Sequence, residues 1–479
     1  MRKFFNLALA TAFICGASVF TACSSDDDNN SKKADEGGQN RKEFVEHTRA
    51  NLKTMAENLN FGSWEVANAI NQYFNEYVLN NPEFERVILP LFAQQALENI
   101  QPVEEGSQLA EMGYEYYASI DLSKINYRFT MTDDNKSFDV EPADNFEMIL
   151  NSYNPQTQQV EKGLRKLTLK AGGKIYKRLL ARMSNDELAV LALIPEDVTF
   201  AISNKITGSW RDAYTGTFKN ASKNSDASKI IVKENDGFSV SGSITSNMPA
   251  VQEIEKAADE TTLKFSIDSD RKNHKGTALV SYEHNGQKMV EFSLKESGEG
   301  TGGLPNLDLS QFSSITSIFD VLGAIWTGRN IDEGKITLLD DLTTTFSISD
   351  MSKVMKLNTE MAEARRNYAD EATIDGYTQQ LDKLIKGSMT CKGVNQTIPM
   401  KLMTDKFGVD YTAVVAFKFA DEENYVPMTQ VLDQKSMEYA LNIADHAIDP
   451  MKESLITVRQ LIQFVNQFIG AQKGDDVAD

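Results

Sequence analysis

Apolar side chains recur every three or four residues in three successive stripes, over 44–59, 66–77 and 84–97. This spacing places the apolar positions of each stripe on one face of a helix. Gly62 and Ser63 separate the first stripe from the second. The pattern therefore predicts three helices that together make a helical region over 41–118.

Between 119 and 300 the spacing of apolar positions changes to two, which is typical of strands. Turn-forming clusters at 133–136, 235–237 and 284–287 interrupt the alternation. Asn-Gly and similar pairs between alternating segments favour hairpins, because both central residues need a positive φ. We expect an antiparallel β-rich region in which each cluster joins the strands beside it, with one helical interruption at 174–193.

The last region, 301–479, combines helical and strand-like spacing of apolar residues. A Gly-rich linker from Glu296 to Asn306 marks its beginning. The expected elements are helices over 308–326, 350–386 (broken near Asp375-Gly376) and 434–469 (divided at Pro450), and strands over 335–349 and 388–420. The whole pattern predicts an α+β fold with N-terminal helices, an antiparallel β-rich middle and a C-terminal mixed region with long helices.

Residues 1–22 have the parts of a secretory signal peptide. Arg2 and Lys3 precede a mostly apolar stretch, and small residues lead to Cys23. The stretch is too short, and too closely followed by charge, for a stable transmembrane span. The Thr-Ala-Cys ending resembles the lipobox of bacterial lipoproteins. That resemblance implies that Cys23 becomes the lipid-bearing first residue of the mature chain; the alternative is an ordinary signal cut near Ala22.

A short acidic run follows the cysteine and resembles the surface-export signal of Bacteroidota lipoproteins. Its residues are Ser24, Ser25, Asp26, Asp27 and Asp28. The resemblance implies a lipid-anchored outer-membrane protein exposed at the cell surface, with a periplasm-facing lipoprotein and a plain acidic linker as alternatives. Residues 23–40 carry no large apolar side chain, so they are expected to be a disordered tether. Such a flexible segment would hold the body about 20–25 Å from the bilayer.

Charge and cysteine content narrow the possible partners. The formal net charge is −20, and removal of Arg2 and Lys3 with the signal peptide makes it −22. That balance argues against nucleic acid and against docking on anionic lipid, so the membrane is expected to be a partner through the lipid anchor only. Cys391 is then the one unmodified cysteine. We expect it to be a buried apolar residue and not a nucleophile, because nothing near it in the sequence marks a base.

Two local patterns resemble cofactor or metal sites, but the elements expected around them do not fit such sites. Gly298 to Gly303 satisfies G-x-G-x-x-G, but a dinucleotide site needs a parallel strand before this loop and a helix directly after it. Here the loop follows a hairpin arm. His274 and His284 lie at opposite ends of one expected strand, about 23 Å apart, and cannot share an ion.

The other candidates have ordinary structural interpretations. A further histidine candidate lies just before Pro450 and comprises Asp445, His446 and Asp449. These residues could form half of a metal site. The alternative is a solvent-exposed helix end, where the helix dipole favours a histidine. Acidic pairs are expected in turns or on exposed faces; they lie at 104–105, 133–134, 340–341 and 421–423. Gly208-Ser209-Trp210 is weakly similar to the opening of lipocalin-like barrels, whose interiors hold small apolar ligands; a residue in the core or at a strand end is the alternative for Trp210.

The sequence thus predicts a lipid-anchored cell-envelope protein that acts by non-enzymatic binding or interaction, without metal, nucleotide or other cofactor. The alternatives are a hydrolase whose active site has no local motif, a binder of small apolar ligands with a lipocalin-like β region, and a structural protein of the envelope. The ligand, the protein partner and the oligomeric state do not follow from the residues.

Overall fold

The chain forms two compact units in the computed structural model. Unit 1 comprises residues 1–65, 267–307 and 319–452, and unit 2 comprises 66–266, 308–318 and 453–479. The structure describes residues 38–58, 82–132, 137–154, 159–183, 188–206, 208–222, 229–231, 237–246, 260–299, 330–392, 394–407, 410–432, 435–436 and 439.

Strand dominates the fold, so the predicted α+β class with long C-terminal helices is wrong. Of the residues that the structure describes, 58% lie in strands and 25% in helices, and the strands belong to a large sheet. The sequence-based error lies mainly in the middle of the chain, where a segment rich in good helix formers is part of a long hairpin. The expected helices over 66–77, 308–326 and 434–469 lie outside the described residues, apart from a few positions at 435–439.

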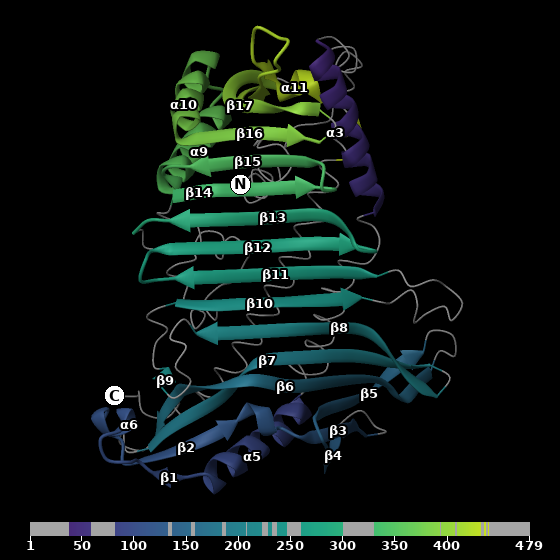
Figure 1. The fold of residues 1–479 in the computed structure, drawn as a ribbon, viewed down its shortest axis with the longest axis vertical. Helices are drawn as coiled ribbons and strands as arrows, with labels where there is room; N and C mark the ends of the chain where they lie inside the picture. Colours follow the sequence, from purple (N-terminus) through teal and green to yellow (C-terminus); the bar gives the residue numbers. More distant parts are fainter. Residues whose placement is uncertain are drawn as a thin grey trace. The chain divides into compact units, whose positions relative to one another are not determined.

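Unit 1 is built on an antiparallel meander whose strands follow one another in chain order (Figure 1). Its strands are β12 (Lys275–His284), β13 (Gln287–Ser297), β14 (Asn330–Leu338), β15 (Leu342–Ile348), β16 (Ile385–Cys391), β17 (Val394–Phe407), β18 (Asp410–Phe417) and β19 (Val426–Pro427). A short helix, α11 (Met428–Val431), follows β19. The boundary between the units falls within β11 (Thr261–Asp270).

Tight turns connect these strands, and the sequence predicts one of the two turns described here. The single strand expected over 335–349 is wrong, because a turn at 339–341 divides it into β14 and β15. Asn285 and Gly286 have φ values of 48° and 77°, and β12 pairs with β13 from His284–Gln287 onward, so this predicted hairpin is confirmed. The turn between β14 and β15 is less usual. Leu339 and Asp340 both have a positive φ, 52° and 55°, although neither is Gly or Asn. A leucine in this region is strained, so the surrounding packing must hold the turn.

A helical pair lies between β15 and β16, as the sequence predicts. It consists of α9 (Met351–Arg366) and α10 (Glu371–Leu384). The Asp370 side chain caps α10 by accepting a hydrogen bond from the Thr373 backbone N–H, so the break falls at 367–370 and not at Asp375-Gly376. Helix α10 covers an edge of β17, because the Asp382 carboxylate accepts the Leu402 backbone N–H at 2.7 Å.

Helix α3 (Gln39–Asn58) confirms the first predicted helix and packs on the sheet of unit 1. Its apolar face belongs to the main core of the unit. The α3 residues in this core are Phe44, Val45, Leu52 and Met55. The Phe44 ring lies 5.5 Å from the Phe417 ring and 5.6 Å from the Phe419 ring, centroid to centroid. Helix α3 is thus held by buried aromatic packing.

The beginning of α3 is capped by acidic side chains from the loop after β18. Oδ2 of Asp421 accepts the Asn40 backbone N–H at 3.0 Å, and Oε1 of Glu422 accepts the Gly38 backbone N–H at 3.2 Å. The first N–H groups of a helix have no partner within it and favour negative charge. Two residues of the acidic cluster 421–423, for which the sequence predicts a turn or an exposed face, therefore hold the start of α3 against the loop after β18.

Replacing Asp421 with alanine should weaken this attachment. We expect the free energy of unfolding to fall by about 1 kcal/mol, the typical cost of removing a side chain that caps a helix. Chemical denaturation followed by circular dichroism measures the change. Glu423→Ala is the matched control, since it removes an exposed neighbouring carboxylate that is not among these caps. Equal losses in both variants would contradict the capping role.

Unit 2 contains the remaining described strands and the helices α5 (Pro82–Glu98) and α6 (Gln108–Glu111), with the short 3-10 helix η2 (Leu122–Lys124). Its strands are β1 (Gln101–Pro102), β2 (Tyr116–Asp121), β3 (Tyr127–Met131), β4 (Phe138–Pro142), β5 (Phe146–Asn154), β6 (Gln159–Met183), β7 (Leu188–Ile206), β8 (Ser209–Ser222), β9 (Ile230–Ile231) and β10 (Gly237–Ser246). The predicted third helix is confirmed as α5, and β3 pairs with β4 across the predicted turn at 133–136.

The long antiparallel pair β6–β7 organises unit 2. One half of the pair is flanked by β5 and β8, and the other half by β9 and β2. The predicted helix at 174–193 is wrong, because this segment lies in the second half of the pair. Lys, Arg and Leu favour helix by less than about 1 kcal/mol per residue, and pairing with burial of Ala189 and Leu191 outweighs that preference.

The predicted hairpin around 235–237 is also wrong. Strand β9 pairs in parallel with β6, whereas β10 pairs antiparallel with β8, from Phe238 opposite Ser222 to Ser246 opposite Tyr214. A local turn signal favours a hairpin only when both neighbouring segments can pair with each other. Here β8 is much longer than β9 and provides β10 with a full-length partner.

Candidate functional site

The chemically richest cluster of described side chains lies in unit 1, where three elements meet. Asp341 belongs to the strained turn between β14 and β15, Cys391 ends β16, and His47 lies on α3. Figure 1 shows the ends of β14 and β16 directed toward α3. One ligand atom from each of the three side chains lies within 4.8 Å of those from the other two.

Asp341 is the centre of this cluster. Its Oδ1 accepts the Lys392 backbone N–H at 2.8 Å and lies 3.5 Å from the Cys391 Sγ. Its Oδ2 accepts the Asn51 side-chain amide at 2.7 Å and lies 3.5 Å from Nδ1 of His47. His47 and Asn51 are one helical turn apart, so both face the carboxylate from the same side of α3.

The pKa of Asp341 is lowered from its ordinary value by this environment. Burial opposes the ionised form and raises the pKa. The hydrogen bonds from Asn51, the Lys392 backbone and Cys391, together with the charge of His47, lower it by more. Asp341 is therefore a carboxylate at neutral pH. Its side chain is 20% exposed to solvent, whereas the His47 side chain is 43% exposed.

This arrangement does not suit a nucleophilic cysteine. Such a site needs the histidine between the thiol and the carboxylate, so that the ring takes the thiol proton. Here the carboxylate lies between the thiol and the ring, and the Cys391 Sγ donates to Asp341. Cys391 is only 3% exposed, so substrate access is poor. The convergence of a sulfur, a nitrogen and an oxygen atom resembles a set of metal ligands more than a catalytic triad.

The other sequence-predicted residues are not brought together among the described residues. His274 and His284 stand at the two ends of β12, as the sequence implies. Gly298 follows β13, which is antiparallel to both β12 and β14, so the preceding strand lacks the parallel context of a dinucleotide site. Trp210 starts β8 and is half-buried, with the Lys166 and Lys205 Nζ atoms 5.0 and 5.7 Å from its ring centre.

Several predicted residues lie outside the described part of the chain. The lipidation and export residues are Cys23, Ser24, Ser25, Asp26, Asp27 and Asp28. The histidine candidate at the other end comprises Asp445, His446 and Asp449. The predictions made for both groups remain predictions.

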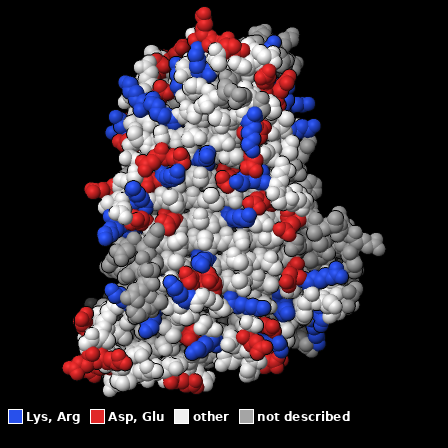
Figure 2. All heavy atoms as spheres, viewed as in Figure 1, with Lys and Arg blue, Asp and Glu red and all other residues white. Residues whose placement is uncertain are grey.

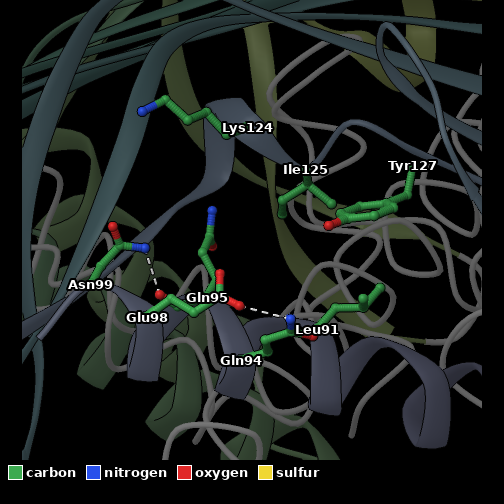
Figure 3. Close-up of a pocket in the computed structure, with 8 residues that line it drawn as sticks. All are labelled: Leu91, Gln94, Gln95, Glu98, Asn99, Lys124, Ile125 and Tyr127. Atoms are coloured by element: carbon green, nitrogen blue, oxygen red, sulfur yellow. Dashed lines mark hydrogen bonds between the residues drawn. The ribbon is translucent and has the colours of Figure 1, made fainter.

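Unit 2 has a hollow of about 250 Å³ beside the end of α5 (Figure 3). Its lining comes from α5 and from the segment that joins η2 to β3: Leu91, Gln94, Gln95, Glu98, Asn99, Lys124, Ile125 and Tyr127. Most of these side chains can form hydrogen bonds. The hollow is thus suited to a small polar ligand and not to the apolar ligand of a lipocalin-like protein.

Hydrogen bonds within the hollow leave one clear acceptor for a ligand. Gln94 donates to Glu98 at 2.8 Å, and the Asn99 amide donates to the backbone oxygen of Gln95 at 2.6 Å (Figure 3). The Gln95 amide donates to the backbone oxygen of Asp121, whereas its Oε1 is buried and accepts no hydrogen bond from the described residues. A buried polar atom of this kind favours a partner, such as a ligand hydroxyl or amide or a water molecule.

Charges of both signs share the surface. Figure 2 shows Lys and Arg side chains interspersed with Asp and Glu side chains over the face that it draws. Some charges of opposite sign form ion pairs; Arg128, for example, pairs with Glu141 and Glu147 at 2.8 and 2.7 Å. The hydrogen bonds and negative charges of Glu147 and Glu141 raise the pKa of the Arg128 guanidinium above its ordinary value. This face therefore offers no uniform basic surface to a polyanion.

His47 and Asp341 are the residues that sequence reasoning missed. Asp341 lies in a turn, one of the two placements expected for the acidic pairs, but nothing in the sequence links it to His47. The i, i+4 placement of His47 and Asn51 was a usable signal, because it puts two polar ligands on one helical face. Only the packing of α3 on the sheet identifies their partner.

Within the described residues, no helix is both long enough and apolar enough to cross a bilayer. The comparisons with known proteins add no relative from which a role could be transferred. No family model, no curated protein and no solved structure matches this chain.

Proposed function

We propose that this chain is a lipid-anchored protein of the outer membrane, exposed at the cell surface, that acts by binding and not by catalysis. The observation that carries the proposal is the Thr21-Ala22-Cys23 ending after a complete signal peptide. The acidic run over 24–28 supports the outward orientation. Binding is the expectation from the sequence, in which no catalytic motif was identified, and the geometry around Cys391 argues against a nucleophilic role for that cysteine.

The polar composition of residues 23–40 supports a tethered arrangement. A flexible segment of that length would have a root-mean-square span of about 20–25 Å. Its far end meets Asp421 and Glu422, which bind the backbone at the start of α3. A binding body held in this way can stay anchored while facing the medium.

The hollow beside α5 is the candidate binding site for a small ligand. Pockets usually combine apolar walls with a few hydrogen-bonding groups that fix orientation. Leu91 and Ile125 supply apolar contact, while Gln95, Asn99 and Tyr127 supply polar groups. This composition favours a ligand rich in hydroxyl or amide groups, and its identity is left to measurement.

Removing the acidic run should change orientation without changing the anchor. For Asp26→Ala, Asp27→Ala and Asp28→Ala combined, we expect unchanged lipidation and a clear fall in the fraction that protease removes from intact cells, because the variant lacks the acidic run that resembles the export signal. Protease treatment of whole cells followed by immunoblotting measures this fraction. Asn29→Ala with Asn30→Ala is the control, because it alters the same segment and removes no charge. Equal accessibility of the acidic-run variant and the wild type would refute surface export through this run.

A further inference from the structure

We propose that His47, Asp341 and Cys391 form a zinc-binding site that joins α3 to the end of the unit 1 sheet. The proposal goes beyond the surface-binding function and does not depend on it. It departs from the sequence-based expectation of no metal, which rested on spacing within single segments. The three ligands come from three segments that only the fold brings together.

Two distances between donor atoms are compatible with tetrahedral zinc. With Zn–S near 2.3 Å and Zn–N and Zn–O near 2.0 Å, a tetrahedron has S–O and N–O edges of about 3.5 and 3.3 Å. The Cys391 Sγ lies 3.5 Å from Oδ1 of Asp341, and Nδ1 of His47 lies 3.5 Å from Oδ2. The third pair, the sulfur and the ring nitrogen, lies within 4.8 Å. Because the two contacts reach different oxygens of Asp341, binding of one ion requires the His47 ring to move toward the oxygen that the thiol contacts.

The types of donor select the metal. Thiolate, imidazole and carboxylate together suit Zn²⁺, whereas Mg²⁺ and Ca²⁺ prefer oxygen ligands alone. Three protein ligands leave the fourth position of a zinc site to water or to an external ligand. The side chain nearest solvent is His47, 43% exposed, against 20% for Asp341, so the fourth position is expected on the side of α3.

Two neighbouring groups orient the central ligand. The Asn51 amide and the Lys392 backbone N–H donate to the two oxygens of Asp341. Such secondary contacts fix a ligating carboxylate, and their loss typically weakens metal binding about 10- to 100-fold. The orientation of Asp341 therefore exists before the metal arrives.

Charge and protons balance on binding. Asp341 is ionised, and His47 binds the metal in its neutral form. The Cys391 thiol loses the proton that it now donates to Asp341, and a sulfur–zinc bond forms. One proton is released per metal ion from this thiol, and the resulting Zn²⁺–thiolate–carboxylate group is neutral. No oxidation or reduction takes place.

Cobalt titration of the full mature chain, purified under reducing conditions and freed of metal, tests the site. Co²⁺ replaces Zn²⁺ in tetrahedral sites and reports its ligands by absorption. We expect a thiolate-to-cobalt charge-transfer band and the visible bands of tetrahedral Co²⁺, both abolished by one equivalent of Zn²⁺. Cys391→Ser should remove the charge-transfer band, and His47→Gln should weaken zinc binding at least about tenfold, as should Asn51→Ala.

The variants separate ligation from folding. His47 is partly exposed, so His47→Gln should keep the fold, and circular dichroism verifies this. His284→Ala is the matched control, because it removes a partly exposed histidine of the same unit that lies outside the cluster. Absence of the charge-transfer band in the wild type would overturn the proposal. So would a band that persists in Cys391→Ser, or zinc affinity that is unchanged in folded His47→Gln.

Discussion

The Cys23→Ala variant is expected to disappear from the outer-membrane fraction. The sequence resembles a lipobox at this position, and the lipid is the one attachment to the membrane that we expect from the sequence. Several acyl chains bind a protein stably to a bilayer, whereas a chain without them has no comparable attachment. We expect nearly all of the variant protein in the soluble or inner-membrane fraction, measured by immunoblotting after separation of membranes by density.

Asn29→Ala with Asn30→Ala is the control for this experiment. It alters the same N-terminal segment and leaves Cys23 in place. The control should therefore remain in the outer-membrane fraction at the wild-type level. Retention of Cys23→Ala in that fraction would contradict anchoring through lipid on this residue.

Phe44→Ala should destabilise unit 1 by about 3–5 kcal/mol in free energy of unfolding, the usual cost of removing a buried phenylalanine ring. Phe44 is 1% exposed and packs on Phe417 and Phe419. Its loss leaves a cavity between α3 and the sheet that the rigid strands cannot fill. Urea denaturation of the mature chain measures the loss in the transition that includes unit 1.

The matched control on the same helix is Glu46→Ala. Glu46 is exposed, and alanine favours helix, so its free energy of unfolding should change by less than about 0.5 kcal/mol. Similar losses for the two variants would mean that α3 is not docked through its aromatic face. A selective loss in Phe44→Ala supports the packing that also positions His47.

Much of unit 1 could be predicted from the sequence because its elements are marked locally. The Asn285-Gly286 turn and the alternation over 388–420 each carry a signal within a few residues. The helical pair over 350–386 is also predicted, although its break falls at 367–370 and not at Asp375-Gly376. Unit 2 was predicted less well. Its β6 and β7 pair as a long hairpin, and the composition of 174–183 favours helix until burial against the neighbouring strands is included.

The candidate sites show the same limit. Residues 21–28 form a contiguous pattern that sequence alone can interpret. By contrast, His47 and Cys391 are far apart in the chain, and Asp341 lies in a turn whose positive φ values at Leu339 and Asp340 have no sequence signature. Only the folded structure brings these three side chains together. Motifs within single segments of the sequence therefore do not predict a metal site here.

The most direct test of lipid anchoring through Cys23 is the mass of the N-terminal peptide from protein extracted from its native membrane. We expect a mature chain that begins at Cys23 and carries acyl groups on this residue. Mass spectrometry after proteolysis in detergent resolves the added mass and the position of the lipid. A mature N-terminus at another residue, or an unmodified Cys23, would contradict the account.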